Sequence, residues 1–338
     1  MHILVFAPNW VGDVVLITPI AEAIKQAYKD SFLSFIVPRR CHDVLIGNPY
    51  VDKLIIFDER SSHRSIREKI KFVSALRRDS YDIVFLLHRS FTRTFLCYLA
   101  GIKQRVGYAY PKRAFLLTHR IPVVNKDSLH KQDYYLKVVE DYGIPFENKN
   151  SRIYICDGAV RRAEVLLKEY IKGDDFRIAL SPSTNWPPKD WPLDYFERFI
   201  HLVHDKLRMV KFFITGSHHK IYFPRFEKEE FVINLSGKTT ILELAAVYRK
   251  MNVVVSGDSG PLHIAASVGT PYVGIYGATS PFLTSPRSST KGKIIFRNTT
   301  CSVPCYVKSC KRDFICMRSV KPEEVAETVR SILEKKDD

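Results

Sequence analysis

The sequence predicts an α/β protein made of two successive doubly wound parallel sheets. Short apolar runs alternate with helix-like segments along the first 150 residues, and the same alternation starts again near residue 178. Such alternation is typical of parallel strands joined by crossover helices. The 338 residues suffice for two domains, each with its own core.

In the first half, the expected strands are short and rich in β-branched and aromatic residues. Residues 2–7 are predicted to form a buried strand, followed by a loop at 8–13 and one helix from about 14 to 28. The other elements expected here are strands at 31–38, 54–57 and 83–87 and helices at 65–77 and 131–142.

The second half repeats the pattern after polar segments at 146–152 and 173–176. We expect domains at 1–155 and 156–320, with a closing helix in a C-terminal segment at 321–338. The elements expected in the second half are strands at 178–181, 210–215, 253–255 and 272–276 and helices at 193–206, 241–249, 262–268 and 322–334.

Residues 251–282 are the most informative stretch. A β-branched run ends in the small residues 256–260, a short apolar helix follows, and a second strand ends at 277–279. Loops at the carboxyl ends of parallel strands are where open α/β sheets bind ligands. Small residues at a helix N-terminus leave N–H groups that suit a phosphate or diphosphate. A purely structural turn is the alternative.

The tetrapeptide Gly257–Gly260 (GDSG) also surrounds the nucleophile of trypsin-like proteases. Those enzymes are all-β proteins and need a distant His and Asp. Here the tetrapeptide lies between a strand and a helix, which argues against a protease.

The chain is strongly basic, with a formal net charge of +16. Between residues 60 and 120 there are 14 Lys and Arg but only three acidic residues. Such a surface attracts nucleic acid, an anionic membrane or a phosphorylated substrate, although a merely solvated basic face is the alternative. We find no zinc-finger, RNP or helix-turn-helix signature, and therefore expect no nucleic-acid partner.

Four of the seven cysteines lie near the C-terminus. They form no CxxC pair and have no nearby His, so a packed or partly oxidised loop is favoured over a zinc site. These residues are Cys301, Cys305, Cys310 and Cys316.

The sequence shows neither a signal peptide nor a membrane span. No apolar run approaches the ~20 residues of a membrane span, and the first residues lack a cationic signal-peptide region. We expect a cytoplasmic chain.

Asp13 follows the first strand, in the segment WVGDVV. Gly12 would let the backbone approach a ligand closely. A carboxylate at this place suits a general base that removes a proton from an acceptor hydroxyl. A helix cap stabilised by the helix dipole is the equal alternative.

The loop 181–192 (SPSTNWPPKDWP) follows the first strand of the second half. Ser183, Thr184 and Lys189 could donate to phosphate oxygens, with Lys189 acting as a point charge. Loops rich in Pro and Trp also serve domain packing. His263, on the helix after residue 260, could contact a phosphate or only pack.

In combination and in this order, four segments resemble glycosyltransferase family 9, the ADP-heptose:lipopolysaccharide heptosyltransferases, and most closely the heptosyltransferase II branch. The resemblance covers nearly the whole chain. The segments are WVGDVVLITP, PSTNWPPKDWP, GDSGPLHIAASVGTPYVGIYGATSP and CSVPCYVKSCKRDFICMRSVKPEEV.

The resemblance implies a GT-B fold, in which two Rossmann-like domains face each other across a cleft. It implies inverting, metal-independent transfer of L-glycero-D-manno-heptose from ADP-heptose to inner-core lipopolysaccharide, with the acceptor in the first domain and the donor in the second. No cofactor is expected. The acceptor would be Kdo-lipid A or a heptosylated inner core, reached by peripheral association with the anionic inner leaflet of the inner membrane.

Matched by position, Asp13 falls on the catalytic base. The expected donor-binding residues are Ser183, Thr184, Lys189, Asp258, Ser259, Gly260 and His263. Basic residues that we expect to bind acceptor carboxylates and phosphates are Arg60, Arg64, Arg67, Arg89, Arg93 and Arg120.

One departure concerns the nucleotide. Some family members carry acidic residues, suited to ribose hydroxyls, where this chain has residues 218–220 (HHK). The competing interpretation is another sugar-nucleotide enzyme of the same fold, either a different core transferase or an epimerase.

Overall fold

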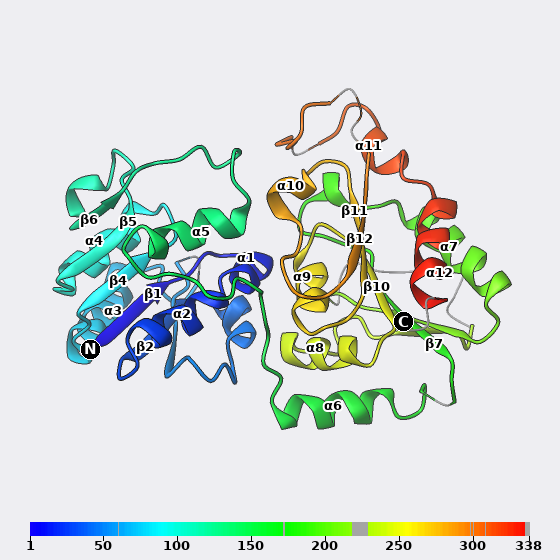
Figure 1. Ribbon diagram of the computed structural model, residues 1–338, viewed down its shortest axis with the longest axis horizontal. Helices are drawn as coiled ribbons and strands as arrows, with labels where there is room; N and C mark the ends of the chain where they lie inside the picture. The colour runs from blue at the N-terminus through cyan, green and yellow to red at the C-terminus, as the bar shows by residue number, and fades with distance from the viewer. Residues whose placement is uncertain are drawn as a thin grey trace. The chain divides into compact units, whose positions relative to one another are not determined.

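The computed structural model describes residues 1–59, 61–171, 173–217, 229–297, 299, 301–307 and 309–334. The chain divides into two compact units, Met1–Tyr154 (unit 1) and Ile155–Asp338 (unit 2). Each described unit contains a parallel six-stranded sheet covered by helices, so the prediction of two doubly wound sheets is confirmed (Figure 1). The HHK segment lies outside the described residues.

Unit 1 has the strand order β3-β2-β1-β4-β5-β6, with all pairs parallel. The chain starts in the middle of this sheet and reverses direction beside β1, which creates a topological switch point next to the residues that follow β1. The elements are β1 (His2–Phe6), α1 (Val11–Leu16), α2 (Pro19–Ala27), β2 (Phe32–Val37), η1 (Arg39–Val44), β3 (Lys53–Ile56), α3 (Ile66–Asp79), β4 (Ile83–Leu86), α4 (Phe91–Leu99), β5 (Gln104–Tyr108), η2 (Ala114–Leu116), β6 (His119–Ile121) and α5 (Lys131–Glu140).

Unit 2 has the order β12-β11-β10-β7-β8-β9 and is again parallel throughout. The elements are α6 (Asp157–Leu167), β7 (Phe176–Ser181), η3 (Pro187–Lys189), α7 (Leu193–Lys206), β8 (Val210–Ile214), β9 (Val232–Asn234), α8 (Ile241–Arg249), β10 (Val253–Gly257), α9 (Gly260–Ser267), β11 (Tyr272–Tyr276), α10 (Pro281–Thr284), β12 (Gly292–Phe296), α11 (Ile315–Arg318) and α12 (Pro322–Leu333).

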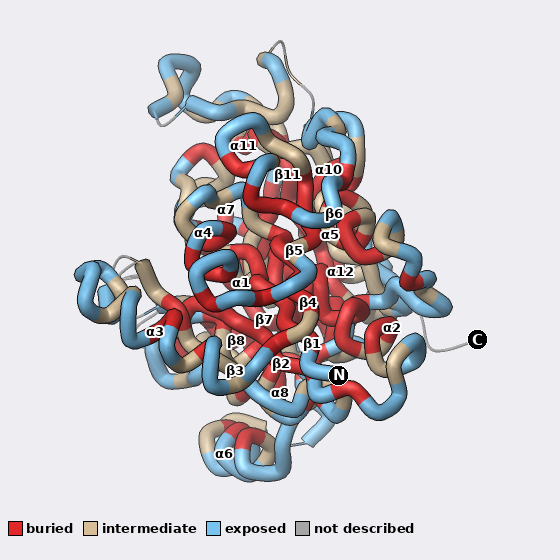
Figure 2. Tube along the Cα trace, turned by 90° about the vertical axis from the view of Figure 1, so that its left-hand side faces the viewer, coloured by how far each residue is buried: buried red, intermediate tan, exposed pale blue. Residues whose placement is uncertain are grey.

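Each unit has its own core, in which the central strands are buried while the outer faces of the helices reach solvent (Figure 2). In unit 1, side chains of α3 and α4 pack together on one face of β1 and β4. In unit 2, α7 and α12 cover one face of the sheet around the buried Trp191. The closing helix α12 is therefore part of the packing of unit 2.

The prediction of one helix from 14 to 28 is wrong. The structure has two helices, α1 and α2, because the Thr18 N–H donates to the Val15 carbonyl, three residues back, and Pro19 follows. Proline has no N–H to continue the ladder but fits the first turn of a new helix. The break ends α1 after six residues; Asp13 lies in the first turn of this short helix, which begins at Val11.

Candidate functional site

In unit 1, Asp13 is held by two side chains of α5. The Lys131 Nζ lies 3.1 Å from Asp13 Oδ1, and the Tyr135 hydroxyl donates to Oδ2 at 3.1 Å. Lys131 and Tyr135 are four residues apart and so occupy the same face of the helix. The Asp13 residue is only 8% exposed. Burial, and then the charge of Asp13, raises the pKa of Tyr135 well above its usual value, so this phenol stays a proton donor to the carboxylate.

His88, which follows β4, lies within electrostatic reach of Asp13 and is surrounded by the side chains of Arg89, Arg93 and Arg113. The Arg93 Nη2 donates to the Asn9 Oδ1 at 2.6 Å, and the Asn9 amide nitrogen lies 3.1 Å from His88 Nε2. The Arg113 Nη1 donates to the backbone oxygen of His88 at 2.5 Å. Burial, reinforced by Arg93, Arg113 and Arg89, lowers the pKa of His88 to about 4. The imidazole is therefore neutral near pH 7.

The structure places the arginines that we expect to bind acceptor in different environments. Arg93 is 3% exposed, and its guanidinium is engaged by Glu59, Ala7 and Asn9 inside unit 1. Arg60 lies outside the described residues. The other four are exposed: Arg64, Arg67, Arg89 and Arg120. Among these, Arg89 influences the pKa of Tyr135, which places it within electrostatic reach of the Asp13 cluster.

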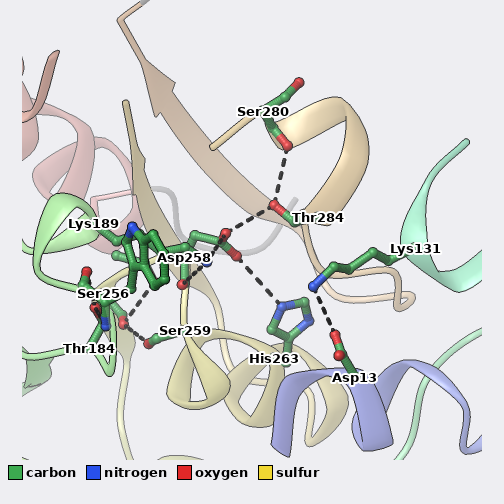
Figure 3. A network of polar contacts seen from close by, with 12 residues as sticks. Asp13, Lys131, Thr184, Lys189, Ser256, Asp258, Ser259, His263, Ser280 and Thr284 are labelled. Carbon is green, nitrogen blue, oxygen red and sulfur yellow. Dashed lines mark hydrogen bonds and ion pairs between the residues drawn. The ribbon is translucent and has the colours of Figure 1, made fainter. Parts of the chain in front are cut away.

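In unit 2, four side chains gather at the carboxyl end of the sheet (Figure 3). Lys189 of η3 comes after β7, Asp258 and then His263 of α9 come after β10, and Thr284 of α10 comes after β11. The Lys189 Nζ lies 2.8 Å from Asp258 Oδ2 and 3.3 Å from the Asp258 backbone oxygen. The Thr284 hydroxyl donates to the same Oδ2 at 3.1 Å, and His263 Nε2 lies 4.0 Å from Oδ1. Lys189, Asp258 and His263 were predicted from the sequence, whereas Thr284 was missed.

Asp258 is an ionised, buried carboxylate. Burial alone would raise its pKa, but the charges of Lys189 and His263 and the hydrogen bonds from Lys189 and Thr279 outweigh burial and lower the pKa below the usual value of 3.8. A carboxylate with so many donors acts as an anchor for them. It holds the Lys189 ammonium, whose side chain is 24% exposed, at the start of the loop that leads to α9.

A close approach of two backbones positions this lysine. A Cβ atom on Gly257 would lie 2.8 Å from the Lys189 carbonyl oxygen, so only glycine fits at the end of β10. The adjacent hydroxyls of Ser256 and Ser259 lie 2.9 Å apart. Ser259 is the N-cap of α9 without a side-chain capping bond, and Gly260 is the first residue of the helix.

The remaining residues expected at the donor loop lie on the same segment. Thr184 is buried; its backbone N–H donates to Asp190 at 2.7 Å, and its hydroxyl donates to the Trp186 carbonyl at 2.8 Å. These bonds shape the loop around η3. Ser183 is half-buried beside it. The structure therefore brings the expected donor residues to one edge of one sheet.

The four C-terminal cysteines line one cavity of unit 2 together with Pro188, Gly277 and Phe314. All seven cysteines are free thiols. Burial raises the pKa of Cys316. In the described ranges, no group of three or more His, Cys, Asp or Glu side chains is arranged to hold a metal ion.

The model of glycosyltransferase family 9 (heptosyltransferase) matches residues 69–315. The chain belongs to this family. It is therefore a glycosyltransferase, and the fold is GT-B, as the resemblance implied. It is 27% identical over 308 residues to the lipooligosaccharide heptosyltransferase 2 of Haemophilus influenzae, covering 85% of this chain and 86% of that protein.

Two further comparisons span the whole length. The lipooligosaccharide heptosyltransferase 2 of Campylobacter jejuni is 25% identical over 345 residues, covering 98% of both chains. The solved structure of the E. coli ADP-heptose lipopolysaccharide heptosyltransferase II superposes with a TM-score of 0.78 at 22% identity and covers 98% of both chains. The described fold is thus shared from end to end with heptosyltransferases.

Proposed function

We propose that this glycosyltransferase moves a heptose from ADP-L-glycero-D-manno-heptose to the inner core of lipopolysaccharide, with inversion at the anomeric carbon. The observation that carries the proposal is the Lys189–Asp258–Thr284–His263 cluster at the sheet edge of unit 2, in a chain of the heptosyltransferase family. Proteins named heptosyltransferase 2 are its relatives over at least 85% of its length.

The donor diphosphate would bind at the edge of unit 2. There the Lys189 ammonium and the N-terminus of α9 supply positive charge where negative charge develops on the leaving ADP. Asp258 would orient Lys189 and His263 toward the phosphates. Ser183, Thr184, Ser259 and Gly260 would complete the cradle: Ser183 and Ser259 with their hydroxyls, Thr184 by holding the loop, and Gly260 with its backbone N–H.

The acceptor would bind to unit 1, where Asp13 acts as the general base. Its carboxylate takes the proton of an acceptor hydroxyl as that oxygen forms the new bond to the anomeric carbon and the bond to the ADP oxygen breaks. Lys131 and Tyr135 hold the carboxylate in one orientation. Lys131 and the exposed arginines of unit 1 would attract the anionic core; these arginines are Arg64, Arg67, Arg89 and Arg120. The donor identity, the base and an inner-leaflet location are all parts of this proposal.

A direct test compares Asp13→Asn with the parent on ADP-heptose and Kdo-lipid A acceptors that carry zero, one or two heptoses. We expect kcat to fall about 10²–10⁴-fold, while ADP binding by calorimetry stays unchanged because the donor residues are in unit 2. Asp30→Asn, a change to an exposed carboxylate, is the matched control. Turnover that survives in Asp13→Asn would refute the assignment of the base.

Mass spectrometry of the acceptor distinguishes the competing function. A transferase raises the acceptor mass by one heptosyl residue, whereas an epimerase changes the sugar nucleotide and leaves the acceptor mass unchanged. A different donor among the ADP- and UDP-sugars would point to another core transferase.

A further inference from the structure

The outer face of α4 is apolar, although it is exposed to solvent. Solvent-facing helices normally turn their polar residues outward. In α4, Arg93 and Thr94 are turned inward, 3% and 0% exposed, beside the buried Leu96 and Cys97, and apolar residues remain on the outer face. The outward residues occur at i, i+4, i+7 and i+8 and are 37% to 50% exposed. They are Phe91, Phe95, Tyr98 and Leu99.

The aromatic rings on this face form an ordered row. Phe91 and Phe95 stack with centroids 5.7 Å apart, and Phe95 stacks on Tyr98 at 6.4 Å. Phe115 of η2, which is 67% exposed, adds a ring 6.4 Å from Phe91. We call these four rings and Leu99 the α4 stripe. A connected exposed apolar surface of this kind marks an interaction site.

Positive charge surrounds the α4 stripe. Residues 89–120 contain seven Lys and Arg and no Asp or Glu; Arg93 and Arg113 are buried, and the other five are at least partly exposed. The Arg105 guanidinium lies 5.3 Å from the centre of the Tyr98 ring. At the C-terminal end of α4, the exposed Arg77 of α3 donates to the Leu99 carbonyl at 2.9 and 2.7 Å. Further exposed cations of this segment are Arg89, Lys103, Lys112 and Arg120.

This charge argues against a second copy of the chain as the occupant. In a symmetric dimer through the α4 stripe, the same cationic rim would meet itself, and like charges across an interface are unfavourable. An anionic bilayer complements both the aromatic rings of the stripe and the positive charge around it. Its interface accepts aromatic rings, and its phosphates attract Lys and Arg, each contributing about 1 kcal/mol near the surface.

We propose that the α4 stripe docks unit 1 on an anionic lipid bilayer. The rings of Phe91, Phe95 and Phe115 enter the boundary between headgroups and acyl chains, while the surrounding Lys and Arg side chains bind lipid phosphates. No described helix is long and apolar enough to cross a membrane. The proposal rests on the exposed side chains alone and does not depend on the donor or acceptor proposed above.

The test uses the full chain and vesicles that contain no lipopolysaccharide. Cosedimentation with phosphatidylglycerol–phosphatidylcholine vesicles should show binding that weakens with salt, and phosphatidylcholine alone should bind far less. The triple variant F91S/F95S/F115S should bind about tenfold more weakly or worse. The double variant K103E/K112E should also lose binding and show a smaller dependence on salt. The matched control is V165S/M209S, which replaces two exposed apolar side chains of unit 2; Val165 is 69% and Met209 is 60% exposed.

Because all three phenylalanines are partly exposed, the triple variant should keep its circular dichroism and its melting temperature, which separates docking from folding. Parent-like vesicle binding by the triple variant would overturn the proposal. The proposal would also be overturned if the parent chain bound phosphatidylglycerol-containing vesicles no better than vesicles of phosphatidylcholine alone. If the triple variant instead converts a dimer to a monomer, as measured by light scattering, while vesicle binding is unchanged, a second copy occupies the stripe.

Discussion

At the scale of single residues, His88 ties the stability of unit 1 to pH. Its pKa is about 4 in the folded chain and near 6.5 when the chain is unfolded. Because the unfolded state binds the proton more readily, protonation of His88 favours unfolding. The folded state is therefore most stable, as far as His88 is concerned, above pH 6.5, and this part of its stability is lost as the pH falls toward 4. Between pH 7 and 4.5 the loss is about 2 kcal/mol for this partly buried group.

Urea unfolding at the two pH values, monitored in the parent and in His88→Gln, measures this effect. Between the two pH values, we expect the free energy of unfolding to fall about 2 kcal/mol less in the variant than in the parent. The variant also loses the hydrogen bond that the Ser90 N–H donates to His88. His119→Gln, at an exposed position, is the control. An equal acid sensitivity in parent and variant would show that His88 is not the group responsible.

The residues around each site show what a sequence can and cannot reveal. Lys189 and Asp258 lie in segments that follow strands, His263 lies on the helix after β10, and the match of these segments to the family motifs assigned all three to the donor site. Lys131 and Tyr135 are 118 and 122 residues from Asp13 in the chain. No local pattern brings them to the carboxylate, because their contact is set by how α5 packs beside α1.

At the scale of elements, α4 was missed for a physical reason. Helices are recognised by an apolar face and a polar face at a period of 3.6 residues. In α4 apolar residues occur on both sides, because Phe91, Phe95 and Tyr98 face outward while Leu96 and Cys97 are buried beside Arg93 and Thr94, so the sequence does not show which face is buried. The strands that flank glycine-rich loops, by contrast, stand out from the polar and small residues that end them, and β1, β10 and β11 were all predicted close to their observed bounds.

The junction between β10 and η3 gives a prediction at this scale. Gly257→Ala would place a methyl group 2.8 Å from the Lys189 carbonyl, and a backbone atom cannot yield as a side chain does. We expect the loop to shift, at a cost on the order of 1–3 kcal/mol of stability, and Lys189 to leave Asp258. ADP affinity in calorimetry should then fall about tenfold, the value of one charge-assisted hydrogen bond.

Gly158→Ala in α6 is the control for this prediction, since a Cβ atom there meets nothing within 4 Å. It should leave ADP binding unchanged and stabilise the helix slightly. Unaltered ADP affinity in Gly257→Ala would mean that the close approach at β10 does not position the lysine.

At the scale of the whole molecule, two cores that share no residue predict two unfolding events. The core of unit 1 contains Phe57, and that of unit 2 contains Phe199; each side chain is buried to within 1%. Truncating a buried phenylalanine to alanine costs about 3–5 kcal/mol, which for a domain of this size lowers the melting temperature by roughly 10 °C. Phe57→Ala should therefore shift one calorimetric transition, and Phe199→Ala the other.

Adding ADP identifies which transition is which. A ligand stabilises only the unit that binds it. ADP should therefore raise the melting temperature of the transition that Phe199→Ala lowers, and should not change that of the transition that Phe57→Ala lowers. If both variants lower the melting temperature of a single common transition, the two units unfold cooperatively although their cores share no residue. If ADP raises instead the transition of unit 1, the donor lies with Asp13, and the proposed division of donor and acceptor is wrong.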